Sequence, residues 1–287
     1  MTQYKKKNTS WQKSAEWYDK IVGTEGHYYH RQIIFPNLLK RVDFANADVL
    51  DLACGQGILS RQIPENTPYL GLDLSKTLID TAREHSASPR HIFGVADMTK
   101  PLDLEARHTH AFIILALQNM TAPLEALKNA SEGLKIGGKL YLVLNHPCYR
   151  IPRHSAWQVD EARKIQQRTV DSYMSTMQIP IAMHPGKGKK SETTFSTHFS
   201  LHSLFGWLKE AGFVVSGLEE WCSDKESIGS KAKMENRARD EFPLFMLIEA
   251  RKESAPQEKK PTAKSPASEK TKRRPHPPKR KSFPGKR

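Results

Sequence analysis

A glycine-rich turn followed by an acidic residue is the part of the sequence best suited to chemistry. The turn is Asp51-Leu52-Ala53-Cys54-Gly55-Gln56-Gly57, and Asp73 lies 22 residues after Asp51 at the end of the next apolar run. Such a turn between a strand and a helix presents backbone N–H groups to a polar or anionic ligand. An acidic residue about twenty positions later can bind a ribose. The opening carboxylate, the glycines and Asp73 together predict a site for a nucleoside-containing ligand.

A second group of reactive side chains, Asn145-His146-Pro147-Cys148-Tyr149-Arg150, follows a run that we predict to be a strand. Ligands of open α/β sheets bind beyond the ends of such strands. His146 could accept a proton, although a histidine that fixes the loop by hydrogen bonds is an equal alternative. Arg150 could bind a carboxylate or a phosphate, although a solvated or acid-paired arginine is the commoner case. The predicted catalytic residues are His146, Tyr149 and Arg150.

Aromatic and polar side chains elsewhere could contact a second ligand. An aromatic group precedes the sheet, with Trp17-Tyr18 and the run 27–31, and packing of a helix onto the domain is its alternative role. The pair Gln118-Asn119 follows seven apolar residues and indicates either a site lining or a strand-end turn. Histidine pairs at 27/30 and 198/202 lack the other ligands that a metal site requires, so no metal is predicted. The predicted substrate-binding residues are Tyr18, Tyr29, His30, Gln118 and Asn119.

Alternating strands and helices must position these residues. From about residue 48, short apolar runs alternate with helix-like stretches, which is typical of a parallel sheet with helices on both faces. Segment 146–198 breaks this rhythm and is typical of a lid or substrate-binding insertion, with a helix expected at 160–177 and a charged loop at 235–242. The predicted strands are 48–52, 68–73, 91–95, 111–117, 139–145, 213–222 and 243–250, and helices begin near residues 58, 75, 123 and 200.

The net charge of +14 over 287 residues is concentrated at one end of the chain. Residues 252–287 contain 13 Lys and Arg and 3 Asp and Glu, which leaves a net charge of only +4 for residues 1–251. This basic tail has too few apolar residues to fold, so we predict that it is disordered. The three cysteines form no close pair, and neither a signal peptide nor an apolar run long enough to span a membrane is present, which favours a cytoplasmic protein.

The turn at Asp51, with Asp73 and with Asp97-Met98 after the third predicted strand, resembles motif I and its partners in the class I S-adenosylmethionine-dependent methyltransferases. The usual motif is acidic-x-Gly-x-Gly-x-Gly, and Ala53 replaces its first glycine here. The resemblance covers residues 48–250 and is closest to the small-molecule-type group (methyltransferase type 11, quinone-biosynthesis-like). It implies a Rossmann-like seven-stranded sheet whose last strand is antiparallel. The implied domains are a helical cap (1–45), a methyltransferase domain (46–251) with the insertion at 146–198, and the tail.

The same resemblance assigns S-adenosyl-L-methionine as the cofactor. It implies that the turn contacts the methionine portion, that Asp73 binds the ribose hydroxyls and that Asp97 and Met98 surround the adenine. An N-terminal helical segment is implied to cover cofactor and acceptor. The implied cofactor-binding residues are Asp51, Ala53, Gly55, Gly57, Asp73, Leu74, Asp97, Met98 and Leu115.

The function that follows is transfer of a methyl group to a small-molecule acceptor by in-line displacement, which depends mainly on holding the reactants in line. A nicotinamide dinucleotide site is a weaker alternative, because Ser60 stands where its fingerprint requires glycine or alanine. Two others remain open: an RNA methyltransferase whose basic tail contacts phosphates, and a cofactor-binding scaffold without catalysis. The acceptor atom and the oligomeric state are not predicted.

Overall fold

A seven-stranded sheet forms the centre of the domain. The computed structural model describes residue 23 and residues 25–182 and 193–256. Four neighbouring pairs in the sheet are parallel, whereas β11 is antiparallel to both of its neighbours, as predicted for the last strand. In spatial order the strands are β10 (Phe213–Trp221), β11 (Phe245–Lys252), β5 (Leu134–Asn145), β4 (His108–Ile114), β1 (Val49–Leu52), β2 (Tyr69–Asp73) and β3 (His91–Val95).

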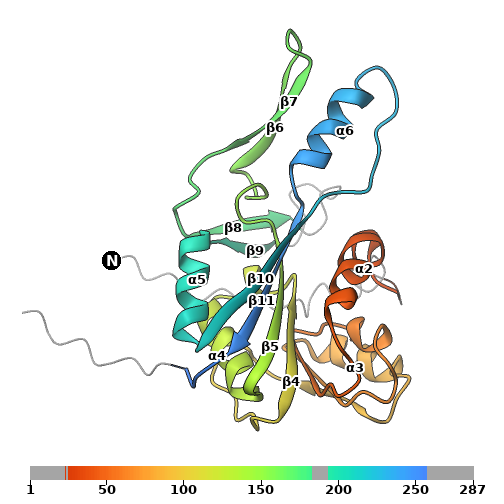
Figure 1. The fold of residues 1–287 in the computed structure, drawn as a ribbon, viewed down its shortest axis with the longest axis vertical. Helices are drawn as coiled ribbons and strands as arrows, with labels where there is room; N and C mark the ends of the chain where they lie inside the picture. Colours follow the sequence, from red (N-terminus) through yellow and green to blue (C-terminus); the bar gives the residue numbers. More distant parts are fainter. Residues whose placement is uncertain (1–22, 24, 183–192, 257–287) are drawn as a thin grey trace, which may run out of the picture. The chain divides into compact units, whose positions relative to one another are not determined.

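Helices cover both faces of this sheet, which confirms the predicted fold class. α4 (Pro123–Gly133) and α5 (Leu201–Glu210) lie on one side, and α2 (Phe35–Leu38) and α3 (Lys76–Glu84) lie on the other (Figure 1). Side chains of a strand point alternately to the two faces. Along β5, Leu140, Leu142 and Leu144 therefore join the core under α4 and α5, while Tyr141 and Val143 join the core under α2 and α3.

The helices begin and end at residues suited to these positions. The side chain of Ser75 accepts a hydrogen bond from the backbone N–H of Leu78 at the start of α3. Ser200 caps α5 in the same way through the N–H of Ser203, and Pro123 occupies the first turn of α4, where no hydrogen bond is lost. Gly212, with φ +84°, ends α5. The three helix starts agree with the sequence prediction.

The prediction of a helix at 160–177 is wrong, because this segment contributes to two strand pairs. The first is β6 (Ser155–Asp160) with β7 (Ile165–Val170), and the second is β8 (Met177–Ala182) with β9 (Thr193–His198). Cross-strand contacts account for the difference: the guanidinium of Arg168 lies over the ring of Trp157, 5.0 Å from its centroid. Such pairs join residues that are distant along the chain, and helical periodicity does not detect them.

Two smaller predictions are also wrong. The charged stretch 235–242 lies largely in a helix, α6 (Ala232–Glu241), which packs against β7 and buries Met234 and Ala238 at helical spacing. After the glycine-rich turn, the expected helix is reduced to the short 3₁₀ turn η4 (Leu59–Arg61). A high density of charged residues therefore did not exclude a helix at 232–241, where only two residues are buried. A short apolar run after the turn did not suffice to form one.

A continuous helical stretch precedes the sheet. It consists of a π-helical turn, η2 (His30–Ile34), followed by α2 and the 3₁₀ turn η3 (Leu39–Arg41). Ile33, Ile34 and Leu38 bury it against the core on the α3 side. The remainder of the predicted cap, including Trp17 and Tyr18, and residues 257–287 of the basic tail lie outside the described residues. Within the described ranges, no helix has the length and apolar character needed to cross a membrane.

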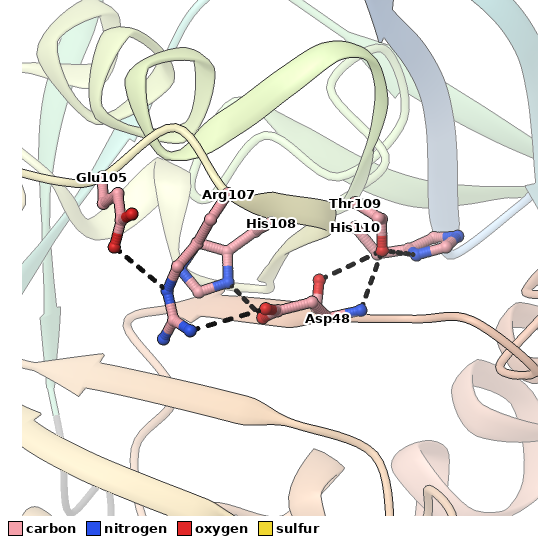
Figure 2. A network of polar contacts seen from close by, with 6 residues as sticks. All are labelled: Asp48, Glu105, Arg107, His108, Thr109 and His110. Atoms are coloured by element: carbon pink, nitrogen blue, oxygen red, sulfur yellow. Dashed lines mark hydrogen bonds and ion pairs between the residues drawn. The ribbon is translucent and has the colours of Figure 1, made fainter.

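A polar network fixes the amino-terminal edge of the sheet, where β1 and β4 begin (Figure 2). The carboxylate of Asp48 lies 2.6 Å from Nδ1 of the buried His108 and 3.6 Å from Nη1 of Arg107. The hydroxyl of Thr109 bonds to both the N–H and the C=O of Asp48. These contacts set the register of the two central strands and thereby the positions of their carboxyl ends.

Substitution of Asp48 by alanine should lower the free energy of unfolding by about 2 kcal/mol, because it leaves a buried imidazole without its partner. Chemical denaturation of the purified chain measures this effect. Glu105→Ala is the matched control, since its exposed carboxylate lies 3.9 Å from Arg107 and should contribute less than about 0.5 kcal/mol. Equal stabilities of Asp48→Ala and the wild-type chain would contradict the role given to this network.

Candidate active site

A cavity of about 570 Å³ opens at the carboxyl ends of five neighbouring strands. Its walls include Ala53 after β1, Asp73 at the end of β2, Asp97 after β3, Ile114 at the end of β4 and Asn145 at the end of β5. Cavities of ~300–1,000 Å³ are typical of small-molecule sites, and the carboxyl edge is where open α/β sheets bind ligands. The cavity therefore has the position and size expected of a ligand site.

The glycine-rich turn and Asp73 are joined directly. The backbone N–H of Gly55 donates to Oδ2 of Asp73 over 2.9 Å, and the N–H of Ser75 donates to Oδ1 over 2.8 Å. Burial raises the pKa of Asp73, and these backbone hydrogen bonds oppose that rise. Gly57 does not line the cavity; a Cβ there would lie 2.9 Å from Cε1 of Phe93, so glycine is required for packing. The carboxylate is thus held at the tip of β2 facing the cavity.

The turn has a left-handed backbone at Ala53, with φ +60°. An L-residue in this conformation costs roughly 1–2 kcal/mol, and glycine avoids this cost. Glycine also gives the unfolded chain more conformational freedom, which offsets part of the gain. We expect Ala53→Gly to raise the free energy of unfolding by about 0.5–1 kcal/mol. Ala45→Gly, at an exposed turn residue without positive φ, is the control and should lower stability by a similar amount. Equal losses in the two variants, measured by denaturation, would refute the assignment of strain to Ala53.

Asp51 lies beneath the turn rather than in the cavity wall. Its buried carboxylate accepts a hydrogen bond of 2.6 Å from the hydroxyl of Tyr69. Burial raises the pKa of Asp51 to about 7, and the nearby charge of Asp73 adds to the rise, whereas the bond from Tyr69 opposes it. The carboxylate that the resemblance places on the methionine portion therefore bonds to Tyr69 on β2 in this structure and does not line the cavity. Tyr69 had no distinguishing signal in the sequence.

Residues implied to surround the adenine line the cavity beside Asp73. Asp97 accepts hydrogen bonds from the N–H and hydroxyl of Thr99 and pairs with Lys100 at 3.1 Å. Burial opposes its ionisation, but these bonds and the ammonium prevail and lower the pKa of Asp97. Met98 is buried, and Leu115 adopts φ +53°. Five further residues that line the cavity are Leu74, Leu78, Met98, Thr99 and Leu115.

The N-terminal helical stretch supplies another part of the wall. Tyr29 and His30 both line the cavity, and the ring of Tyr29 contacts that of Phe245 at a centroid distance of 5.5 Å. Burial lowers the pKa of His30 to about 4, and the neighbouring His27 adds to the shift. The Nδ1 atom of His30 is buried without a hydrogen-bond partner among the described residues. At pH 7 this imidazole is therefore neutral.

Of the predicted polar pair, only Asn119 lines the cavity. The Gln118 side chain turns instead to the end of β5, where its amide accepts from the N–H of Asn145 over 3.0 Å and donates to the C=O over 3.1 Å. Both residues belong to the 3₁₀ turn η5 (Leu117–Asn119). Gln118 thus fixes the backbone from which the next wall of the cavity extends.

The three residues predicted to be catalytic lie in different surroundings. Arg150 lines the cavity, whereas His146 and Tyr149 do not. His146 is buried; its Nε2 lies 2.6 Å from a carboxylate oxygen of Glu220, and its Nδ1 accepts the N–H of Cys148 over 3.2 Å. Tyr149 stacks on the His146 ring at 4.7 Å. Both nitrogens of His146 are therefore engaged within the protein, as in the loop-fixing alternative.

Several lining residues were not identified from the sequence. They come from the end of the turn η5 after β4, the loop after β5, the hairpin of β8 and β9, and the start of β11, all distant from the glycine-rich turn along the chain. Their apolar or small polar side chains carry no chemical signature, and only the tertiary fold brings them to the cavity. They are Met120, Pro152, Ile181, Thr194, Ser196 and Phe245.

Comparison with known proteins agrees with this geometry. Residues 49–138 match a family model described as a methyltransferase domain. A ubiquinone biosynthesis O-methyltransferase from Coxiella burnetii is 25% identical over 107 residues, which cover 36% of this chain and 45% of the relative. A malonyl-[acyl-carrier protein] O-methyltransferase from Hahella chejuensis is 31% identical over 96 residues, covering 32% and 34%. The chain thus spans less than half the length of these curated relatives.

A similar fold occurs in a solved structure, an S-adenosylmethionine-dependent methyltransferase from Mesorhizobium loti. It has a TM-score of 0.61 at 23% identity and covers 80% of this chain and 100% of that one. The strand order, the antiparallel β11 and the cavity at the carboxyl edge define a Rossmann-like α/β protein. The matched methyltransferase domain, residues 49–138, confirms for that part of the chain the resemblance to the class I S-adenosylmethionine-dependent methyltransferases found in the sequence.

Proposed function

We propose that the chain transfers a methyl group from S-adenosylmethionine to a small-molecule acceptor. The observation that carries the proposal is the cavity wall formed by the glycine-rich turn and the Asp73 carboxylate that it binds. The matched domain and the small-molecule O-methyltransferases among the curated relatives support it. Since each relative is matched over less than half its length, the activity and the acceptor are proposals for this chain.

The residues present fit the cofactor chemically. Asp73 offers carboxylate oxygens for the two ribose hydroxyls, and Asp97, Met98 and Leu115 offer a mixed polar and apolar wall for the adenine. Ala53 and Gly55 bring the backbone close to the cavity, as a zwitterionic amino-acid group requires. When bound, S-adenosylmethionine supplies a methyl group on a sulfonium that is already a good leaving group.

The contribution of the protein is then mainly orientation and exclusion of water. Holding an acceptor in line with the donor can supply much of the rate acceleration without a protein base. Tyr29 and Phe245 give the cavity an aromatic wall on the acceptor side, and the β8–β9 hairpin adds apolar and small polar side chains. The neutral imidazole of His30 also lines the cavity, but a pKa of about 4 makes it a weak base at pH 7, so we assign it no proton transfer.

Incubation of the full chain with methyl-labelled S-adenosylmethionine and a cell extract tests this function. The extract is divided beforehand into small-molecule, RNA and protein fractions. We expect label in the small-molecule fraction, and no label with chain that has been heat-inactivated. Label in RNA alone would favour the alternative in which the basic tail contacts phosphates. Cofactor binding without label in any fraction would favour a non-catalytic scaffold.

A further inference from the structure

The part of the cavity not assigned to the cofactor contains a guanidinium. Arg150 is the one arginine or lysine among the described residues that line the cavity. It follows the end of β5, and its backbone N–H donates to the C=O of His146 over 2.9 Å. His146 is itself fixed by Glu220. These bonds therefore fix the backbone of Arg150 at the edge of the cavity.

The head group of Arg150 is also held in place. Its Nη1 atom donates to Oδ1 of Asn145 over 2.9 Å, and its Cζ lies 5.5 Å from the centroid of the Phe245 ring. Burial lowers the pKa of Arg150, yet a guanidinium remains charged at neutral pH. One amide and one aromatic face thus orient a partly desolvated cation.

The charge of Arg150 is not balanced by the residues around it. Within the described ranges, Arg150 takes part in no ion pair, its charged or titratable neighbours are Tyr29 and Arg168, and Arg168 adds a second positive charge. The acids in the cavity wall have other partners: Asp73 accepts two backbone N–H groups, and Asp97 is bound by Thr99 and Lys100. A partly buried cation without an acidic partner is stabilised when an anion binds it.

We propose that the acceptor carries an anionic group, a carboxylate or a phosphate, that binds Arg150 while its body lies against Tyr29 and Phe245. The two rings contact each other at the cavity wall, so an apolar or aromatic body would cover them. The guanidinium has donors besides the one bonded to Asn145, which suits an anion with two oxygens. This inference rests on the proposed function and specifies its acceptor.

The test divides the small-molecule fraction of the extract by anion exchange at pH 7 before adding labelled S-adenosylmethionine. The wild-type full chain should label compounds in the retained, anionic portion. Phosphatase treatment of that portion distinguishes the two sources, since labelling lost on treatment indicates a phosphate and labelling kept indicates a carboxylate. Labelling of the unretained portion alone would overturn the anionic acceptor while leaving the methyltransferase function intact.

Variants show whether Arg150 is responsible. Arg150→Gln should reduce labelling of the retained portion by about 100-fold, the loss expected for one charged hydrogen-bonded contact. Arg150→Lys should recover part of it, because the charge is kept. Cofactor affinity, measured by calorimetry, should change less than about twofold in both, which also shows that the variants fold. Arg251→Gln, at an exposed arginine paired with Glu253, should label as the wild-type chain does.

Two further results have a definite meaning. Labelling by Arg150→Gln at the wild-type rate would overturn the role of Arg150 even if the acceptor is an anion. Absence of label from both portions, with S-adenosylmethionine still bound by the wild-type chain, would contradict the proposed function itself. The same experiment therefore distinguishes an acceptor that does not bind Arg150 from a chain that does not transfer a methyl group.

Discussion

Replacement of Asp73 by alanine should weaken binding of S-adenosylmethionine by about 100-fold. The carboxylate lies at the end of β2 in the cavity wall, where it would accept hydrogen bonds from the ribose hydroxyls. Losing two such bonds to a charged acceptor costs on the order of 2–3 kcal/mol, or roughly 30- to 150-fold in affinity. The substitution also releases the N–H groups of Gly55 and Ser75, which loosens the turn. Titration calorimetry with the purified chain measures the loss.

Asp80→Ala is the matched control for this variant. Asp80 lies on α3, close to Asp73 along the chain, but its exposed carboxylate pairs with Lys76 and Arg83 outside the cavity. Its removal should leave cofactor affinity within about twofold of the wild-type value, since exposed pairs contribute little. If Asp73→Ala bound the cofactor as tightly as Asp80→Ala, the ribose contact would be wrong.

Protonation of His30 should by itself lower the free energy of unfolding by about 3 kcal/mol between pH 7 and pH 4. Burial lowers the pKa of His30 from 6.5 to about 4 in the folded chain, so the unfolded chain takes up a proton first as the pH falls. The stabilisation is complete above the unfolded pKa of 6.5 and is lost as the pH approaches the folded value of about 4. A difference of about 2.5 pKa units corresponds to roughly 3 kcal/mol. Burial also lowers the pKa of His91, His108, His110, His146 and His198, which act in the same direction. The raised pKa values of Asp51 and Asp73 act in the opposite direction, so the contribution of His30 has to be isolated with a variant.

Denaturant unfolding of the wild-type chain and His30→Phe over this pH range isolates the contribution. Phenylalanine keeps the ring that stacks on Phe35 but cannot take up a proton. The difference in unfolding free energy between the two proteins should shift by about 3 kcal/mol in favour of the variant as the pH falls to 4. Between pH 7.5 and 8.5 it should stay constant, which is the internal control. A difference that is the same at pH 4 and pH 8 would show that His30 is not buried as described.

The meeting of the glycine-rich turn with Asp73 at the cavity could be predicted from the sequence because its signals are local. An apolar run, a turn with glycines, an acidic residue at the next strand end and a serine cap follow one another within residues 49–75, and each has its own physical cause. The structure joins them through the bonds from Gly55 and Ser75 to Asp73. The seven strands of the sheet and the antiparallel β11 likewise agree with the fold that the resemblance implies.

The acceptor side could not be predicted in the same way because it is assembled from distant segments. Phe245 and Ser196 reach the cavity only through the sheet and the β8–β9 hairpin, and neither residue type suggests a site. The loop-fixing role of His146 was one of two alternatives, and its partner Glu220 could not be predicted because it lies 74 residues later in the chain, on β10. The β6–β7 hairpin was missed for a related reason, since its stability comes from cross-strand pairs such as Trp157 with Arg168.

A crystal structure of the chain with S-adenosylhomocysteine, the demethylated product of the cofactor, would show whether this cavity is the cofactor site. We expect the product to occupy the cavity at the carboxyl edge of the sheet, with its ribose hydroxyls on the Asp73 carboxylate and its adenine beside Asp97 and Met98. Its sulfur should face the part of the cavity lined by Tyr29 and Arg150. A product molecule bound elsewhere, or a ribose that makes no contact with Asp73, would contradict the assignment of this cavity to the cofactor.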